Sequence, residues 1–267
     1  MASTFGAPYR FDVGRVIQRA FAAIGHNFAV FALLSLLLAG VPSALTGGLL
    51  GLATQGPSTS PTPTGATGDE LAALGASVFA LAYLASAVGG LILTAALVHG
   101  AVADLNGRRA GFGECLATGV RNAFWLFLIG LIVAVAEVFG YLLFVVPGIM
   151  MATAWISAVP VRVVERLGPF GALGRSAELT RGHRWAIFGL MIIYLLGSWM
   201  LQGAVLAVIG SLAEAGPTVL PVNALVLQPL VASATHMVSA AGVASIYYEL
   251  RSGREGIGPE ALAAVFD

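Results

Sequence analysis

Long apolar stretches alternate with short polar segments along the whole chain, and this pattern predicts its secondary structure. A helix needs about 20 apolar residues to cross the roughly 30 Å hydrocarbon core of a membrane. Six stretches meet or approach this length: 28–52, 71–102, 122–146, 147–164, 185–213 and 221–248. We therefore predict an all-α, polytopic integral membrane protein, in which residues 1–267 form a single transmembrane domain.

The third and fourth stretches are contiguous, and Pro147 and Gly148 mark the boundary between them. A proline inside a helix removes a backbone hydrogen bond and clashes with the preceding turn. A glycine next to it permits a tight reversal. The pattern therefore favours two short spans over one long helix. Between the first two spans, residues 54–68 are rich in Pro, Ser, Thr and Gly, which predicts a flexible external loop.

Three shorter segments, 10–26, 111–121 and 169–182, have apolar residues at helical spacing and arginines at other positions. An amphipathic helix with arginines on its polar face is typical of the membrane interface. An ordinary helix packed against its own protein would show the same pattern. We predict that the six spans form three transmembrane hairpins, each preceded by a cytoplasmic interfacial helix.

The three predicted units resemble one another, which indicates an internal repeat. Each short amphipathic segment ends in a polar residue followed by an aromatic residue, and residues 256–265 resemble 111–120. The chain thus contains three copies of one unit in the same orientation, with the start of a fourth. The alternative is that segments at a membrane boundary are alike in any membrane protein.

The basic residues, all 13 of them arginine, predict the orientation of the spans. Positively charged residues favour the cytoplasmic side of a membrane, and every arginine falls on one side of the six predicted spans. The opposite loops contain only Asp69, Glu70 and Glu214. Both termini are therefore predicted to be cytoplasmic. We expect six arginines to bind anionic lipid headgroups: Arg15, Arg19, Arg121, Arg175, Arg181 and Arg184.

The composition supports a membrane protein and excludes several other classes. Hydrophobic residues make up 58% of the chain and charged residues only 10%, whereas soluble domains contain about 25% charged residues. The net charge is zero, which gives no support for nucleic-acid binding. Cys115 is the single cysteine, and no zinc-site or nucleophile motif is present. We predict a non-enzymatic protein with no cofactor and no metal.

Two ionisable residues, Glu137 and His236, lie inside predicted spans. At 1.5 Å per residue, they are about 22 Å and about 20 Å from the cytoplasmic boundary. Ionisable groups inside a bilayer usually face a partner, so one hypothesis is that these two residues bind each other. The alternative is that each has a separate partner, such as Gln202, Gln228, Tyr141 or a backbone carbonyl.

Small residues predict where helices approach one another closely. Ala82, Ser86 and Gly90 are spaced four apart on the second span, and small side chains let neighbouring backbones come close in lipid. We expect this face to pack within the chain, with dimerisation as the alternative.

A string of residues runs from the fourth span to the fifth: Pro147, Pro160, Glu165, Gly168, Ser176, Thr180 and Gly182. With its Ala-Leu, Arg-Ser and Leu-Thr pairs, this string resembles the membrane domain attached to some bacterial glycerophosphoryl diester phosphodiesterases. The resemblance implies a six-helix domain of the bacterial cytoplasmic (inner) membrane, also found as a stand-alone protein. The family's catalysis belongs to a separate barrel domain, for which this chain has no room.

Three functions follow as alternatives. The first is a non-enzymatic inner-membrane protein that organises lipids or a partner protein, with its arginines on anionic headgroups. The second is a small transporter or channel that uses Glu137 and His236, although the spans offer few polar residues to line a path. The third, suggested only by the family resemblance, is an accessory membrane subunit of a lipid-modifying enzyme.

Overall fold

The computed structural model describes residues 11–54, 68–213 and 223–255, and their regular secondary structure is entirely helical. Six helical segments are long and apolar enough to cross a membrane: Phe28–Gly48, Gly75–Leu105, Phe112–Leu142, Val146–Glu165, Arg184–Ile209 and Leu225–Glu255. The all-α class and the six candidate spans of a multi-pass membrane protein are thereby confirmed. The predicted loop at 54–68, the acid Glu214 and the segment 256–265 lie wholly or almost wholly outside the described residues.

The helices differ from the predicted segments mainly at their ends. In chain order they are α1 Val13–His26, α2 Phe28–Ser35, the π-helical η1 Leu36–Gly40, α3 Val41–Thr54, α4 Gly68–Leu105, α5 Phe112–Leu143, α6 Val145–Trp155, α7 Ala158–Glu165, α8 Pro169–Thr180, α9 Arg184–Ala213, the π-helical η2 Asn223–Leu227 and α11 Gln228–Glu255.

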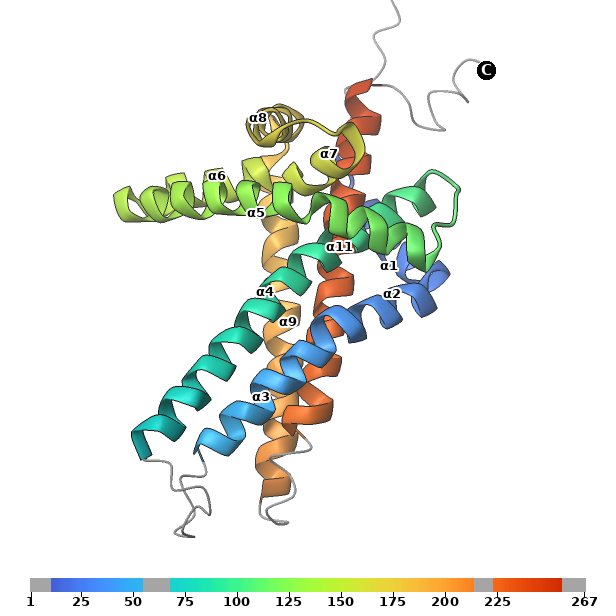
Figure 1. Ribbon diagram of the computed structural model, residues 1–267. Helices are drawn as coiled ribbons and strands as arrows, with labels where there is room; N and C mark the ends of the chain where they lie inside the picture. The colour runs from blue at the N-terminus through green and yellow to red at the C-terminus, as the bar shows by residue number, and fades with distance from the viewer. Residues whose placement is uncertain (1–10, 55–67, 214–222, 256–267) are drawn as a thin grey trace, which may run out of the picture.

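Helices α5 and α6 run in a different direction from the other long helices. Figure 1 shows α9 and α11 upright, α3 and α4 side by side and slanted relative to them, and α5 and α6 side by side and crosswise to α9 and α11. The short helices α7 and α8 lie at the end of the molecule where α11 ends and α9 begins (Figure 1). Three equivalent hairpins and a threefold repeat therefore stay predictions, because α5 and α6 have their own direction.

Both π-helical segments precede a proline, Pro42 after η1 and Pro229 after η2. Proline has no backbone N–H, so the carbonyl four residues earlier loses its helical donor and the local turn widens. For Pro42 that carbonyl belongs to Leu38. Its oxygen would lie 2.5 Å from a Cβ atom added to Gly89 of α4. The proline in the first span thus frees a carbonyl that faces Gly89 of α4.

The segment 111–121 is not the separate interfacial helix that we predicted. Instead α5 continues through it to Leu143, because nothing around Asn122 stops the helix and its side-chain amide donates to the Thr118 carbonyl. The predicted break before the fourth span is confirmed within a few residues, since Phe144 is extended with φ −164° and ψ 152°. Pro147 follows in the first turn of α6, where a missing N–H is tolerated.

The turn between α5 and α6 gives a direct test of topology. Because α5 is apolar around most of its circumference beyond Asn122, we expect the pair to enter the membrane and its turn to reach the outside. In a background without thiols (Cys115→Ala), Phe144→Cys should react with a membrane-impermeant maleimide added outside intact cells.

The matched control for this labelling is Arg109→Cys, in the exposed connection between α4 and α5, which should react only after the membrane is permeabilised. Labelling of Phe144→Cys only after permeabilisation would place the α5–α6 pair along the cytoplasmic face. The arginine pattern alone allows both arrangements, because removing two consecutive spans leaves every arginine on its original side.

Candidate functional site

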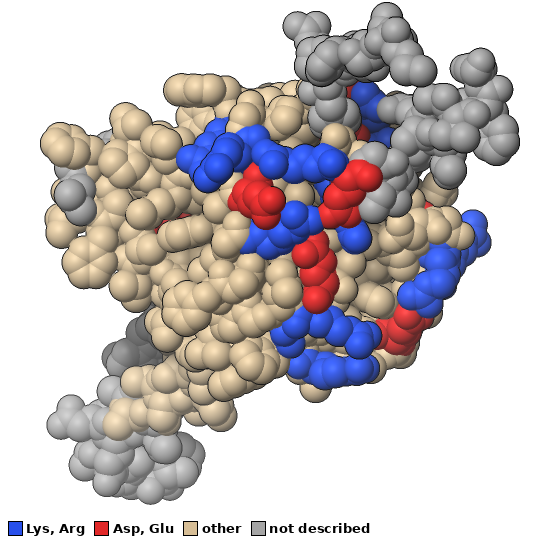
Figure 2. All heavy atoms as spheres, turned by 90° about the horizontal axis from the view of Figure 1, so that it is seen from above, with Lys and Arg blue, Asp and Glu red and all other residues tan. Residues whose placement is uncertain are grey.

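Charged side chains gather at the end of the molecule that carries α7 and α8. Figure 2, which views the molecule from above this end, shows arginine and acidic side chains in contact with one another across it. We call this surface the charged end. Its residues come from α1, α7, α8 and α11, which lie far apart in the sequence and meet here.

The most buried acid of the charged end is Glu249 of α11, whose side chain is 1% exposed. Arg19 of α1 forms an ion pair with one of its carboxylate oxygens, and the Nε of Arg15 lies 3.4 Å from the other. The Arg19 guanidinium also lies over the Tyr248 ring, 5.2 Å from its centroid. These contacts fix α1 on α11, together with the buried Val16 of α1.

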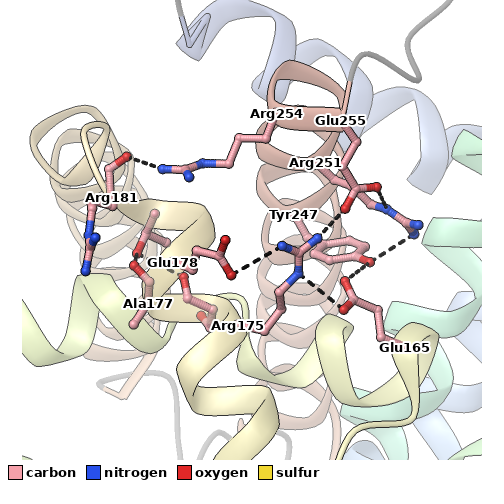
Figure 3. A network of polar contacts seen from close by, with 11 residues as sticks. Glu165, Arg175, Ala177, Glu178, Arg181, Tyr247, Arg251, Arg254 and Glu255 are labelled. Carbon is pink, nitrogen blue, oxygen red and sulfur yellow. Dashed lines mark hydrogen bonds and ion pairs between the residues drawn. The ribbon is translucent and has the colours of Figure 1, made fainter.

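A second cluster joins three helices through Arg175 of α8 (Figure 3). Its guanidinium forms ion pairs with Glu165 at 3.4 Å, with Glu178 at 3.4 Å and with Glu255 of α11. Burial of Arg175 disfavours its charged form and lowers its pKa. The nearby carboxylates, of which Glu165 contributes most, outweigh this effect and raise the pKa of Arg175. The cluster therefore keeps a permanent positive charge among three acids.

Tyr247 extends this cluster along α11. Its hydroxyl donates to Glu165 at 2.9 Å and accepts from Arg251 at 3.2 Å, and Arg251 also donates to Glu255 at 2.7 Å. Figure 3 shows these side chains pointing toward one another between α7 and α11. The arrangement is a closed set of mutually satisfied charges, which is typical of a structural network.

The motif residues Ser176 and Thr180 hold α8 against the junction of α6 and α7. The Ser176 hydroxyl donates to the Ala154 carbonyl at 2.8 Å and accepts from the Ser157 N–H at 3.2 Å. The Thr180 hydroxyl donates to the Ser176 carbonyl at 3.0 Å and lies 3.3 Å from the Ala154 carbonyl. Both side chains are fully buried. They satisfy backbone groups that the interruption between α6 and α7 exposes.

The other motif residues also have local structural positions. Pro147 and Pro160 lie in the first turns of α6 and α7, and Gly168 is the residue before α8. Gly182 has φ +92° in the turn between α8 and α9, a conformation that favours glycine. Pro147 lies at the start of the fourth span, whereas Pro160, Glu165, Gly168 and Gly182 belong to its end and to the connection with the fifth span.

The six arginines that we predicted to bind headgroups separate into two groups. Arg15, Arg19 and Arg175 bind carboxylates of the protein itself. The guanidinium groups of the other three have no carboxylate partner within the described part of the chain: Arg121, Arg181 and Arg184. The sequence could not separate the groups, because the acids that bind the first three lie on other helices.

A large apolar groove lies between α1, α6, α9 and α11, with a volume of about 940 Å³. Phe188, Met191, Leu195 and Ser198 line it from one face of α9, and Val16 and Phe21 are among its residues on α1. The groove exists because α9 packs little against the rest, since only 6% of its apolar window is buried. Sequence reasoning did not find this groove.

A small polar pocket of about 150 Å³ lies between α9 and α11. Its polar lining consists of Gln202 from α9 and Gln228, Thr235 and His236 from α11. No hydrogen bond or ion pair joins His236 to Glu137 in the described residues, and Glu137 does not line the polar pocket. The structure thus places His236 beside both glutamines and does not bring Glu137 to it.

The described residues contain no group of three or more His, Cys, Asp or Glu side chains that could hold a metal ion. Comparisons with protein families, with curated proteins and with solved structures find no match for this chain. The resemblance to the phosphodiesterase-associated membrane domain therefore rests on the motif residues alone. The groove, the polar pocket and the charged end are the features of the structure that bear on function.

Proposed function

We propose that this chain is a multi-pass protein of the bacterial cytoplasmic membrane that binds a membrane lipid and catalyses no reaction. Both termini lie in the cytoplasm, on the side of the charged end. The apolar groove is the observation that carries this proposal. Its volume of about 940 Å³ lies at the upper end of the range of about 300–1,000 Å³ that is typical of ligand sites.

The position of the groove favours a hydrocarbon chain as its occupant. Three of its walls, α6, α9 and α11, belong to candidate spans, and its lining is almost wholly apolar. The solvent at that depth of a membrane is lipid, so an acyl or isoprenoid chain can enter the groove without crossing water. Arg121, Arg181 and Arg184, which lack an internal carboxylate among the described residues, are available to anionic headgroups of the surrounding membrane.

The transporter alternative has less support. It needs a polar path past Glu137 and His236, whereas the large groove is apolar and the polar pocket holds only one of these residues. An accessory role beside a lipid-modifying enzyme is compatible with lipid binding, and co-purification of such an enzyme would favour it.

The groove can be filled by one substitution. Gly197 of α9 lines it, and a Cβ at Gly197 would meet nothing within 4 Å. The aromatic ring of Gly197→Phe should therefore occupy the groove without disturbing the helix. We expect the amount of lipid that co-purifies with the protein, measured by native mass spectrometry, to fall by about tenfold, which corresponds to about 1.4 kcal/mol.

The control for this experiment is Gly203→Phe on the same helix. Gly203 also has open space around it but does not line the groove, so its variant should retain lipid as the unmodified protein does. Equal lipid retention by the Gly197 and Gly203 variants would refute lipid binding in the groove.

A further inference from the structure

The polar pocket is unusual because it places hydrogen-bonding side chains inside the candidate spans. Gln202 is 18 residues from the start of α9 at Arg184, about 27 Å along the helix, so the pocket lies far from the charged end. The side chains of Gln202, Gln228 and His236 have no hydrogen-bond partner among the described residues. Gln202 is exposed, and Gln228 and His236 are half-buried, so all three side chains are accessible at the surface of the spans. Polar groups that face the hydrocarbon without a partner are costly, and a bound molecule with polar atoms would satisfy them.

The lining of the pocket specifies the chemistry of that molecule. Two carboxamides and an imidazole offer both donors and acceptors, whereas the described lining contains no arginine, aspartate or glutamate. A charged phosphate would find no counter-charge here. An uncharged group with carbonyl or hydroxyl oxygens can instead accept from the glutamine amides and bind the His236 ring.

The polar pocket adjoins the apolar groove. Thr235 lines both of them, and on α9 the groove residue Leu201 is followed directly by the pocket residue Gln202. A molecule with an apolar chain and a small polar head would therefore place its chain along α9 and its head between Gln202 and His236. The volume of about 150 Å³ limits the head to a small group.

The geometry points to a specific class of ligand: a lipid with an uncharged, oxygen-bearing head, such as a quinone or a glyceride, bound with its head in the pocket and its chain in the groove. This inference rests on the proposed function, and it specifies the chemical class of the polar head of the bound lipid. An anionic phospholipid would bind the other way round, with its headgroup at Arg184 and its chain end toward the pocket.

The test compares three lipids on the purified full-length protein in detergent. Decylubiquinone and dioctanoylglycerol carry uncharged heads, and dioctanoyl phosphatidylglycerol carries a charged one. Binding is measured by the shift in unfolding temperature and, for the quinone, by quenching of Trp199, which lies one turn from Gln202. We expect at least one uncharged lipid to bind about tenfold or more tightly than the charged lipid.

Variants of the pocket test the proposed contacts. Gln202→Leu, Gln228→Leu and His236→Leu should each weaken binding of the uncharged lipid about fivefold, the effect of one lost hydrogen bond. Gln18→Leu on the exposed face of α1 is the matched control and should bind as before. Without lipid, the pocket variants should unfold at or above the temperature of the unmodified protein, because each removes an unpaired polar group.

The outcomes separate the two proposals. Tighter binding of the quinone or of the glyceride identifies the source of the uncharged head, and either result supports the inference. Equal binding of all three lipids, or pocket variants that bind like Gln18→Leu, would overturn the inference and leave lipid binding in the groove intact. If no lipid binds, and Gly197→Phe changes nothing, the proposed function fails as well.

Discussion

Replacement of Glu249 by alanine is expected to lower the free energy of unfolding by about 3 kcal/mol, the largest effect of any single substitution at the charged end. The carboxylate is 1% exposed and pairs with Arg15 and Arg19. Its removal takes the carboxylate from Arg19 and leaves Arg15 beside Asp12 at 3.8 Å, and breaking such a buried pair costs about 3–5 kcal/mol. We place the effect at the lower end because both arginines retain some contact with solvent.

The measurement is thermal or chemical unfolding of the purified protein in detergent. Glu178→Ala is the matched control, because Glu178 also binds an arginine but is 58% exposed, and it should change stability by less than about 0.5 kcal/mol. In the double variant of Arg19 and Glu249, the losses should be less than additive. Strictly additive losses would show that the Arg19–Glu249 contact does not contribute to stability.

This prediction also separates two roles for Arg19. If Arg19 serves to hold α1, Arg19→Ala should destabilise the protein and leave its binding to anionic vesicles nearly unchanged. If Arg19 serves to bind headgroups, as its position on an amphipathic helix indicated, the same variant should unfold normally and bind such vesicles more weakly.

The second large effect is expected at the points where helices come closest. A Cβ on Gly119 of α5 would lie 2.5 Å from the Ile92 carbonyl oxygen, and one on Gly89 would lie as close to that of Leu38. Backbone atoms cannot rotate away, so an added methyl group must push the helices apart. We expect Gly119→Ala and Gly89→Ala each to lower stability by about 2 kcal/mol, within the range for overpacked sites.

Two neighbouring glycines provide controls on the same helices. A Cβ on Gly90 or on Gly113 meets nothing within 4 Å, and alanine favours a helix over glycine by about 1 kcal/mol. Gly90→Ala and Gly113→Ala should therefore be neutral or stabilising in the same unfolding measurement. If all four alanine variants behave alike, close packing at Gly89 and Gly119 is not what holds α4 against its neighbours.

The glycines show how far small-residue patterns can be interpreted. The spacing of Ala82, Ser86 and Gly90 predicted a packing face on the second span. Between residues 81 and 90, these three are half-buried and Gly89 is buried, whereas the other residues are exposed. Gly89 lies about 20° from Ala82 around the helix, so the pattern indicated the correct side of α4. It did not indicate that Gly89 is the residue that meets the Leu38 carbonyl.

For the motif between the fourth and fifth spans, the sequence pattern did not indicate the role of its residues. Sequence reasoning identified Ser176 and Thr180 as noteworthy but gave them no role. Their role depends on the Ala154 carbonyl, more than 20 residues away. No local pattern encodes a bond between a hydroxyl and a distant backbone oxygen.

The sequence by itself determined the helical class, the number of candidate spans, the break between the third and fourth spans and the grouping of the arginines, because hydropathy, proline and charge act over short distances. Only the tertiary structure decided the crosswise direction of α5 and α6, the arginines that bind acids of the protein, and the groove beside α9. These features depend on which faces of distant helices meet. In a chain that is apolar on nearly every face, hydrophobicity does not distinguish one packing partner from another.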